Sequence, residues 1–165
     1  MLGSCALRSA CAVAAFIAAP ACARAGDDGP CGPATGRVAQ VTDGDTVRLE
    51  SGEKIRYLLV DTPENTSETE CFGPEASRFN ADLVEGKDVE LAYDEECTDD
   101  YDRLLAYVTV QDREVNSLLV ERGFACALYI PPNGADRRQE FESLEDQARV
   151  DSRGLWGACP EKPCN

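Results

Sequence analysis

Residues 41–64 read VTDGDTVRLESGEKIRYLLVDTPE. Two acidic turns, at 43–46 and 61–64, enclose two strand-like runs, 47–50 and 54–60, which is the pattern of a β-hairpin. Asp45 and Asp61 lie eight positions on either side of Glu53, so to within one register step they face each other at the open end. Such opposed residues have Cβ atoms about 5 Å apart. Because two facing carboxylates repel, the pattern predicts a shared proton or a bound cation between them.

The composition restricts the chemistry that this chain can perform. It has 165 residues and no histidine. The absence of histidine excludes Ser-His-Asp triads, Cys-His dyads and histidine-ligated metals. Catalysis, if any, must therefore use carboxylates, arginines, hydroxyls and a hard metal ion.

The first 25 residues have the features of a signal peptide. A short basic start precedes the apolar run 10–19, which is too short to span a bilayer, and Ala23-Arg24-Ala25 resembles a cleavage site. A short anchor helix is the alternative, and Cys22 also permits lipid attachment. We expect a mature chain that is secreted or periplasmic, begins near Gly26 and has no transmembrane segment. It would have an irregular lead-in at 26–37, one domain at 38–158 and a tail at 159–165.

Six of the nine cysteines follow the expected leader, and an even number in an exported chain indicates disulfides. Six cysteines allow fifteen connectivities, and the sequence does not choose among them. We favour Cys71 with Cys97, and Cys126 with the tail. The six are Cys31, Cys71, Cys97, Cys126, Cys159 and Cys164.

The expected mature chain is strongly acidic. After residue 26 it has 14 basic and 31 acidic residues, so its net charge is 14 − 31 = −17. Such a field repels nucleic acid over roughly 8 to 10 Å at physiological salt. A polyanionic substrate would have to be captured locally, through a bound cation and a few arginines.

The order of predicted elements favours one fold class. After a strand at 38–41 and the hairpin, we expect a helix from Pro74 to Gly86, a strand at 89–93, an acidic loop at 94–102 and a buried strand at 104–110. A short helix at 115–123, an extended stretch at 124–130 and a helix at 136–150 follow. This order predicts an α+β, mainly β protein: a five-stranded OB-fold barrel with three helices, stabilised by disulfides.

Four separated blocks carry a family resemblance. They are residues 43–47, residues 56–64, the Gly-Pro-Glu-Ala segment at 73–76, and the segment from Asp99 to Tyr107. In this order they resemble the staphylococcal nuclease (thermonuclease) family over roughly residues 38–156. The resemblance implies the OB barrel and calcium-dependent hydrolysis of phosphodiester bonds in DNA and RNA. We expect a monomer without a stable protein partner.

The resemblance also assigns roles. Asp45, Asp61 and the backbone carbonyl of Thr62 would bind Ca²⁺, and Glu64 would be the candidate general base. The remaining roles are phosphate binding by Arg56 and Arg103, and a nucleotide site formed by Tyr101 and Tyr129.

Three residues, Arg56, Asp100 and Asp102, do not fit simply with the hairpin pattern or with the family resemblance. Arg56 lies five residues before Asp61, so in a straight strand the two side chains would point to opposite faces. A bulge, barrel curvature or a strand that ends before Asp61 must bring them together. Asp100 stands where the family often has a lysine, and Asp102 replaces a glycine, so both add negative charge beside the substrate path.

Two other functions remain open from the sequence. One is a non-catalytic OB-fold module that holds nucleic acid or another ligand, and the other is an acidic, calcium-responsive structural protein. Each feature also has a purely structural interpretation: the paired aspartates could be turn formers with a water between them, and the two arginines could be structural partners for surplus acid.

Overall fold

The computed structural model describes residues 29–65, 69–160 and 164. The strands are β1 (Thr35–Asp43), β2 (Thr46–Leu49), β3 (Lys54–Tyr57), β4 (Val60–Asp61), β5 (Asp88–Thr98), β6 (Leu104–Val110), β7 (Arg113–Glu114) and β8 (Cys126–Ala127). The helices are α1 (Gly73–Val84), α2 (Val115–Glu121), α3 (Arg138–Val150) and the single turn α4 (Leu155–Ala158). The expected leader lies outside the described residues.

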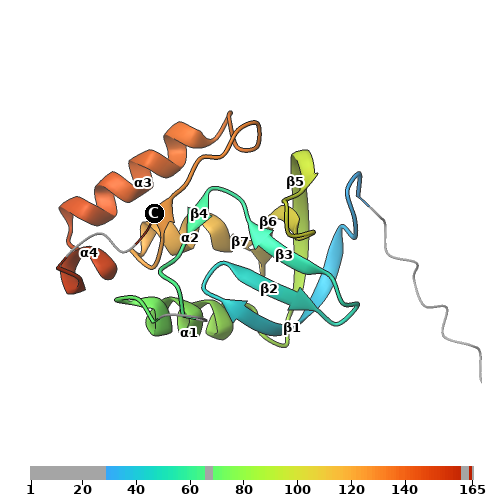
Figure 1. Ribbon diagram of the computed structural model, residues 1–165, viewed down its shortest axis with the longest axis horizontal. Helices are drawn as coiled ribbons and strands as arrows, with labels where there is room; N and C mark the ends of the chain where they lie inside the picture. Colours follow the sequence, from blue (N-terminus) through green and yellow to red (C-terminus); the bar gives the residue numbers. More distant parts are fainter. Residues whose placement is uncertain (1–28, 66–68, 161–163, 165) are drawn as a thin grey trace, which may run out of the picture.

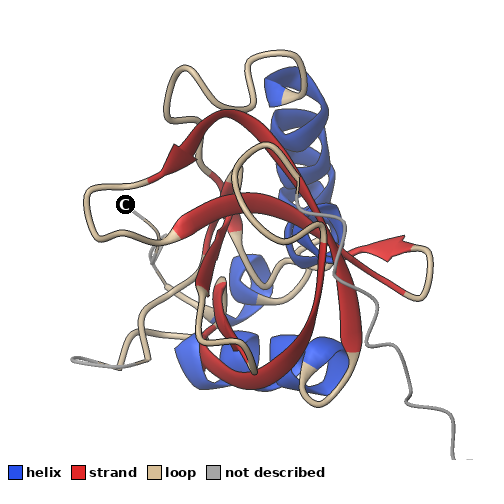
Figure 2. Cartoon of the chain, turned by 90° about the vertical axis from the view of Figure 1, so that its right-hand side faces the viewer, coloured by secondary structure: helices blue, strands red, loops and turns tan. Residues whose placement is uncertain are grey.

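Five strands form a closed barrel, which confirms the predicted fold (Figure 2). The order is β3-β2-β1-β5-β6, and a parallel pairing of β3 with β6 closes the ring. β7 adds to the outer side of β6, and β4 pairs with β8 in a separate two-stranded sheet. Closure removes the free edges that an open five-stranded sheet would expose.

The three predicted helices are present and lie outside the barrel (Figure 1). α1 packs against β1, α2 against β6, and α3 against α2. Pro74 stands in the first turn of α1, where its missing N–H costs nothing, and Glu75 suits the positive end of that helix. Within the described part of the chain, no helix combines the length and the apolar character that crossing a bilayer requires.

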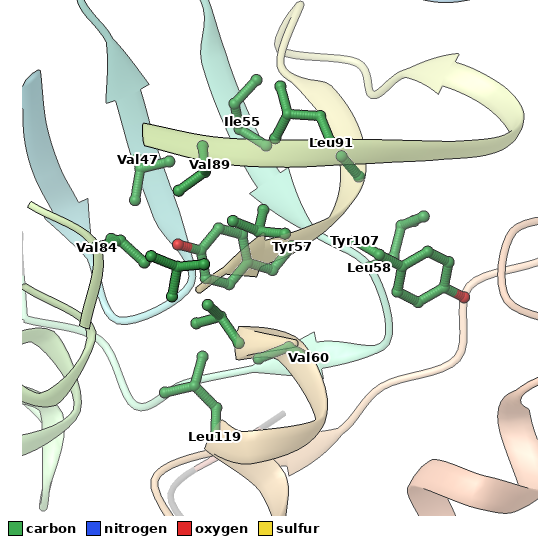
Figure 3. Close-up of a cluster of buried hydrophobic side chains, with 14 of the residues drawn as sticks. Val47, Ile55, Tyr57, Leu58, Val60, Val84, Val89, Leu91, Tyr107 and Leu119 are labelled. Carbon is green, nitrogen blue, oxygen red and sulfur yellow. The ribbon is translucent and has the colours of Figure 1, made fainter. Parts of the chain in front are cut away.

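The core fills the barrel and the space between it and α2 (Figure 3). Alternate residues of each strand point inward, so Val47, Ile55 and Val89 are almost fully buried. Tyr57 is also buried, and its hydroxyl donates a hydrogen bond to Asn80 Oδ1 at 3.0 Å. Burial raises the pKa of the Tyr57 hydroxyl well above its usual range.

The hairpin register differs from the prediction. Thr46 pairs with Arg56, so the hairpin is centred near Ser51 rather than Glu53, and Asp45 lies opposite Tyr57. The cause is the tight turn at Gly52, whose φ of 111° places it in the region that favours glycine. Asp45 and Asp61 are therefore not a directly opposed pair in this hairpin.

The sequence predicted a loop over the whole acidic segment 94–102, but the first part of this segment is a strand. β5 continues to Thr98, and the side chain of Asn133 hydrogen-bonds both the N–H and the carbonyl of Glu96, at 2.8 and 2.9 Å. These bonds take the place of a neighbouring strand. Conversely, the expected extended stretch 124–130 forms a strand only at Cys126–Ala127, and β1 begins at Thr35 rather than Val38.

Three disulfides join distant parts of the chain. Cys31 pairs with Cys97, Cys71 with Cys159, and Cys126 with Cys164. The predicted link from Cys126 to the tail is confirmed, but Cys71 with Cys97 is wrong. Pairing depends on which Cα atoms lie within about 7 Å in the fold, and spacing in the sequence does not show this.

Candidate functional site

Arg56 connects the two aspartates that the register separates. Its Nη1 lies 2.9 Å from Asp45 Oδ2, and its Nη2 lies 3.4 Å from Asp61 Oδ1. Nη1 also donates to the carbonyl of Val60 at 2.7 Å. β3 ends at Tyr57 and the chain turns at Leu59, whose φ is 60°, before β4 begins. Asp61 thus lies past the end of the strand that carries Arg56, which is one of the three arrangements the sequence allowed.

Asp45 is buried and accepts several hydrogen bonds. The N–H and the hydroxyl of Thr62 donate to its Oδ2 at 2.9 and 3.0 Å, and the hydroxyl of Thr46 donates to its Oδ1 at 3.0 Å. The turn must pass very close to Thr62: a Cβ on Gly44 would lie 2.6 Å from the Thr62 hydroxyl oxygen. Glycine at 44 is therefore required for Asp45 to reach Thr62.

Asp43 belongs to this site, although the sequence assignment of roles omitted it. Burial raises the pKa of the Asp43 carboxyl to about 6; the hydrogen bond from the Gly44 N–H opposes this, and the Asp45 charge and the Glu64 side chain add to it. The hydroxyl of Ser77 on α1 also donates to Asp43 Oδ1, at 3.2 Å. The available signal was the acidic turn itself, in which Asp43 and Asp45 stand on either side of Gly44.

Arg103 is held at the entrance to β6 by Asp99. Its Nε and Nη2 lie 2.7 and 2.6 Å from Asp99 Oδ2, and Nη1 donates to the Thr46 hydroxyl at 3.5 Å. Burial raises the pKa of the Asp99 carboxyl, but the hydrogen bonds from Arg103 and from the Tyr101 N–H outweigh it, so the pKa is lowered. The Arg103 guanidinium also lies 5.4 Å from the centre of the Tyr101 ring.

Two neighbouring cavities meet at these residues. A polar cavity of about 450 Å³ has basic and acidic walls; its lining includes Asp43, Asp45, Lys54, Arg56, Glu64 and Arg103, with Tyr101 at its side. A second cavity of about 330 Å³ shares Arg56, Tyr101 and Arg103. The rest of its lining is mixed, with apolar residues such as Leu58 and Leu105 and the acidic residues Glu96, Asp99 and Asp100. Tyr101 is 77% exposed. A strongly charged cavity thus adjoins one with both apolar and acidic walls, and two guanidiniums are common to both.

The structure brings together most of the residues singled out from the sequence. Asp45, Arg56, Asp61 and Thr62 form one bonded group, and Glu64, Tyr101 and Arg103 line the polar cavity beside it. Tyr129 lines neither cavity, and the guanidinium of Arg138 lies 5.0 Å from the centre of its ring. Lys54, at the start of β3, lines the polar cavity and was not singled out from the sequence.

The acidic side chains offer only oxygen donors, which are the ligands that hard dications prefer. Across residues 29–65, 69–160 and 164, no group of three or more carboxylate, cysteine or histidine side chains comes together as a metal cluster. Arg56 contacts both Asp45 and Asp61, but its single positive charge offsets only one of the two carboxylates. The donor chemistry fits a dication such as Ca²⁺, which would share these two carboxylates with the guanidinium.

Comparisons with known proteins show what this chain is similar to. A family model described as "Staphylococcal nuclease homologue" matches residues 54–158. The chain is 36% identical to endonuclease YncB of Bacillus subtilis (strain 168), over 69% of this chain and 57% of that protein. It is 32% identical to the SPbeta prophage-derived endonuclease YokF of the same organism, over 71% and 42%, and 34% identical to the thermonuclease of Staphylococcus intermedius, over 72% and 74%. The chain thus spans about half the length of the two Bacillus subtilis endonucleases.

Proposed function

Because the chain belongs to the staphylococcal nuclease family, we propose that it is an exported, calcium-dependent nuclease that hydrolyses phosphodiester bonds of DNA and RNA. The observation that carries the proposal is the pair of guanidiniums of Arg56 and Arg103 on the wall of one acidic cavity. Each is fixed by carboxylates, so both present positive charge at defined positions. A phosphodiester in this cavity would meet planar donors that match its oxygens.

Each residue then has a chemical task. Arg56 and Arg103 bind the phosphate and stabilise the negative charge that grows on its oxygens in the transition state. The exposed carboxylate of Glu64 accepts a proton from the attacking water. As water forms its bond to phosphorus, the bond between phosphorus and the leaving oxygen breaks, and that oxygen takes up a proton. Tyr101 lies beside both cavities and offers its exposed ring to a base.

We place Ca²⁺ at Asp45, Asp61 and the carbonyl of Thr62, where it would supply Lewis-acid stabilisation of phosphate charge. The contacts of the two aspartates with Arg56 and Thr62 support this assignment. They hold both carboxylates in place before an ion binds. The disulfides support export, because such bonds persist in oxidising compartments.

We expect the purified chain to degrade plasmid and single-stranded DNA when Ca²⁺ is added and to lose this activity with excess chelator. Gel electrophoresis of the products against time measures the effect, and re-addition of Ca²⁺ after chelation is the control. Cleavage that persists in excess chelator contradicts the metal role. Binding of DNA without cleavage in any divalent cation would instead favour a non-catalytic binding module.

Asp100 should weaken the binding of DNA, because it adds negative charge to the wall of the second cavity next to Tyr101. We expect Asp100→Lys to lower KM for DNA by about 2- to 10-fold, the size of one or two exposed ion-pair contributions. kcat should stay the same, and the difference should shrink as salt rises. Steady-state kinetics at two salt concentrations test this.

The matched control is Glu90→Lys. Glu90 is an exposed residue of β5 that lines neither cavity, and its replacement makes the same change in net charge. An equal fall in KM for both variants would show that overall charge, and not position 100, governs binding.

A further inference from the structure

The backbone of Glu64 is hydrogen-bonded to Glu70, in the segment that follows it. Its N–H donates to Glu70 Oε2 at 2.8 Å, and the Glu70 N–H donates back to the Glu64 carbonyl at 2.9 Å. The two residues therefore satisfy each other's backbone groups. The first of these bonds is charge-assisted, and such bonds are the stronger class.

Glu70 is itself tied to the protein on its C-terminal side. Its carbonyl accepts from the Gly73 N–H at 3.1 Å, at the start of α1. Gly73 packs directly on the Glu64 carbonyl, because a Cβ at this position would overlap that oxygen. The next residue after Glu70 is Cys71, whose disulfide to Cys159 reaches the chain just after α4.

The position of Glu64 is thus fixed from two sides. Thr62 is bound to Asp45 through its N–H and its hydroxyl, and Glu70 binds the N–H of Glu64 itself. Between these points lies only Pro63, whose ring restricts φ. The Glu64 side chain lines the polar cavity beside Asp43, and this backbone sets the point from which it enters the cavity.

We propose that Glu70 is a positioning residue that holds the backbone of Glu64, and that the Cys71–Cys159 disulfide holds Glu70 in place. The inference rests on the proposed function, in which Glu64 accepts the proton of the attacking water. Glu70 does not touch the substrate in this arrangement. It acts by keeping the Glu64 carboxylate at the distance and angle that proton transfer requires.

The first test compares substitutions at Glu70 in DNA cleavage with Ca²⁺. We expect Glu70→Ala to lower kcat by about 10- to 100-fold, the cost of displacing a catalytic group by about 1 Å, with KM unchanged. Glu70→Gln keeps an oxygen acceptor for the Glu64 N–H and should retain most of kcat. Glu75→Ala, a loss of the same charge at an exposed position of α1, should leave kcat as it is. A kcat for Glu70→Ala within twofold of the unmodified chain overturns the proposal.

A double-mutant cycle separates this inference from the proposed function. If Glu70 acts through Glu64, Glu70→Ala should have no further effect on kcat once Glu64→Ala is present. An equal loss in both backgrounds shows that Glu70 acts by another route and overturns the inference alone. Unchanged kcat in Glu64→Ala by itself overturns the role given to Glu64, and the inference with it.

The disulfide is tested by removing both of its cysteines. The double variant Cys71→Ser, Cys159→Ser should lower kcat with KM unchanged. The unmodified chain is the control. The variant Cys31→Ser, Cys97→Ser, which removes a disulfide between the segment before β1 and β5, shows what the loss of another disulfide does to stability. Both are assayed at a temperature where circular dichroism shows them to be folded. A kcat for Cys71→Ser, Cys159→Ser equal to that of the unmodified chain would show that this disulfide only stabilises the fold.

Discussion

We expect Arg103→Ala to lower kcat for DNA cleavage by about 10³-fold, because it removes a planar donor aimed at the charge of the transition state. Its guanidinium lines both cavities and is fixed by Asp99 at 2.6 and 2.7 Å. Arg103→Lys should recover little, since an ammonium cannot make two parallel bonds to a phosphate or fill the same contact with Asp99. Stopped-time assays with Ca²⁺ at saturating DNA measure kcat directly.

The control for Arg103 is Arg113→Ala. Arg113 is an exposed residue of β7 that lines neither cavity, so its replacement makes the same change in net charge away from the site. We expect its kcat to match that of the unmodified chain. A loss of less than about threefold in Arg103→Ala would remove Arg103 from the site, because an oxyanion donor contributes about 10²-fold or more.

Much of the fold could be predicted because it depends on local periodicity. Alternation in β5, the continuous apolar run of β6 and the apolar stripes of α1 and α3 identify those elements without knowledge of their neighbours. The end of β5 was missed because its last residues are acidic and exposed. They remain in a strand through the side chain of Asn133, about 37 positions later, a tertiary contact that no local pattern contains.

The sequence predicted which residues belong to the candidate site better than it predicted how they are arranged. The turn chemistry of 43–46 and 61–64 marks Asp45 and Asp61, but the register depended on a conformation of Gly52 that shifts the centre of the hairpin. The guanidinium of Arg56 bridges the two aspartates. This contact requires the turn at Leu59, where a non-glycine residue adopts positive φ. Such a turn is imposed by surrounding packing and is not favoured by leucine itself.

That packing includes one residue on which both the barrel and the site depend, Asn116 of α2. It is fully buried, and its Nδ2 donates to the carbonyls of Leu58 and Ala106 at 2.9 and 3.2 Å. Its Oδ1 accepts from the Val108 N–H at 2.8 Å. The side chain thus ties β6 to the turn that carries the chain from Arg56 to Asp61.

We expect Asn116→Ala to lower the free energy of unfolding by about 2 to 4 kcal/mol, because it leaves several buried backbone groups without a partner. Asn116→Asp should cost at least as much at neutral pH, since a carboxylate would face two carbonyl oxygens in a buried position. Urea denaturation followed by circular dichroism gives both values, provided that the dependence on urea concentration is unchanged.

The neighbouring residue provides the control. Ser117 is only partly buried, and its hydroxyl donates to the Glu114 carbonyl at 3.4 Å, so Ser117→Ala should change stability by about 0.5 kcal/mol or less. If Asn116→Ala proved as stable as Ser117→Ala, the three hydrogen bonds of Asn116 would contribute nothing net to the fold. The turn at Leu59 would then have to be held by apolar packing alone, and kcat in Asn116→Ala should equal that of the unmodified chain.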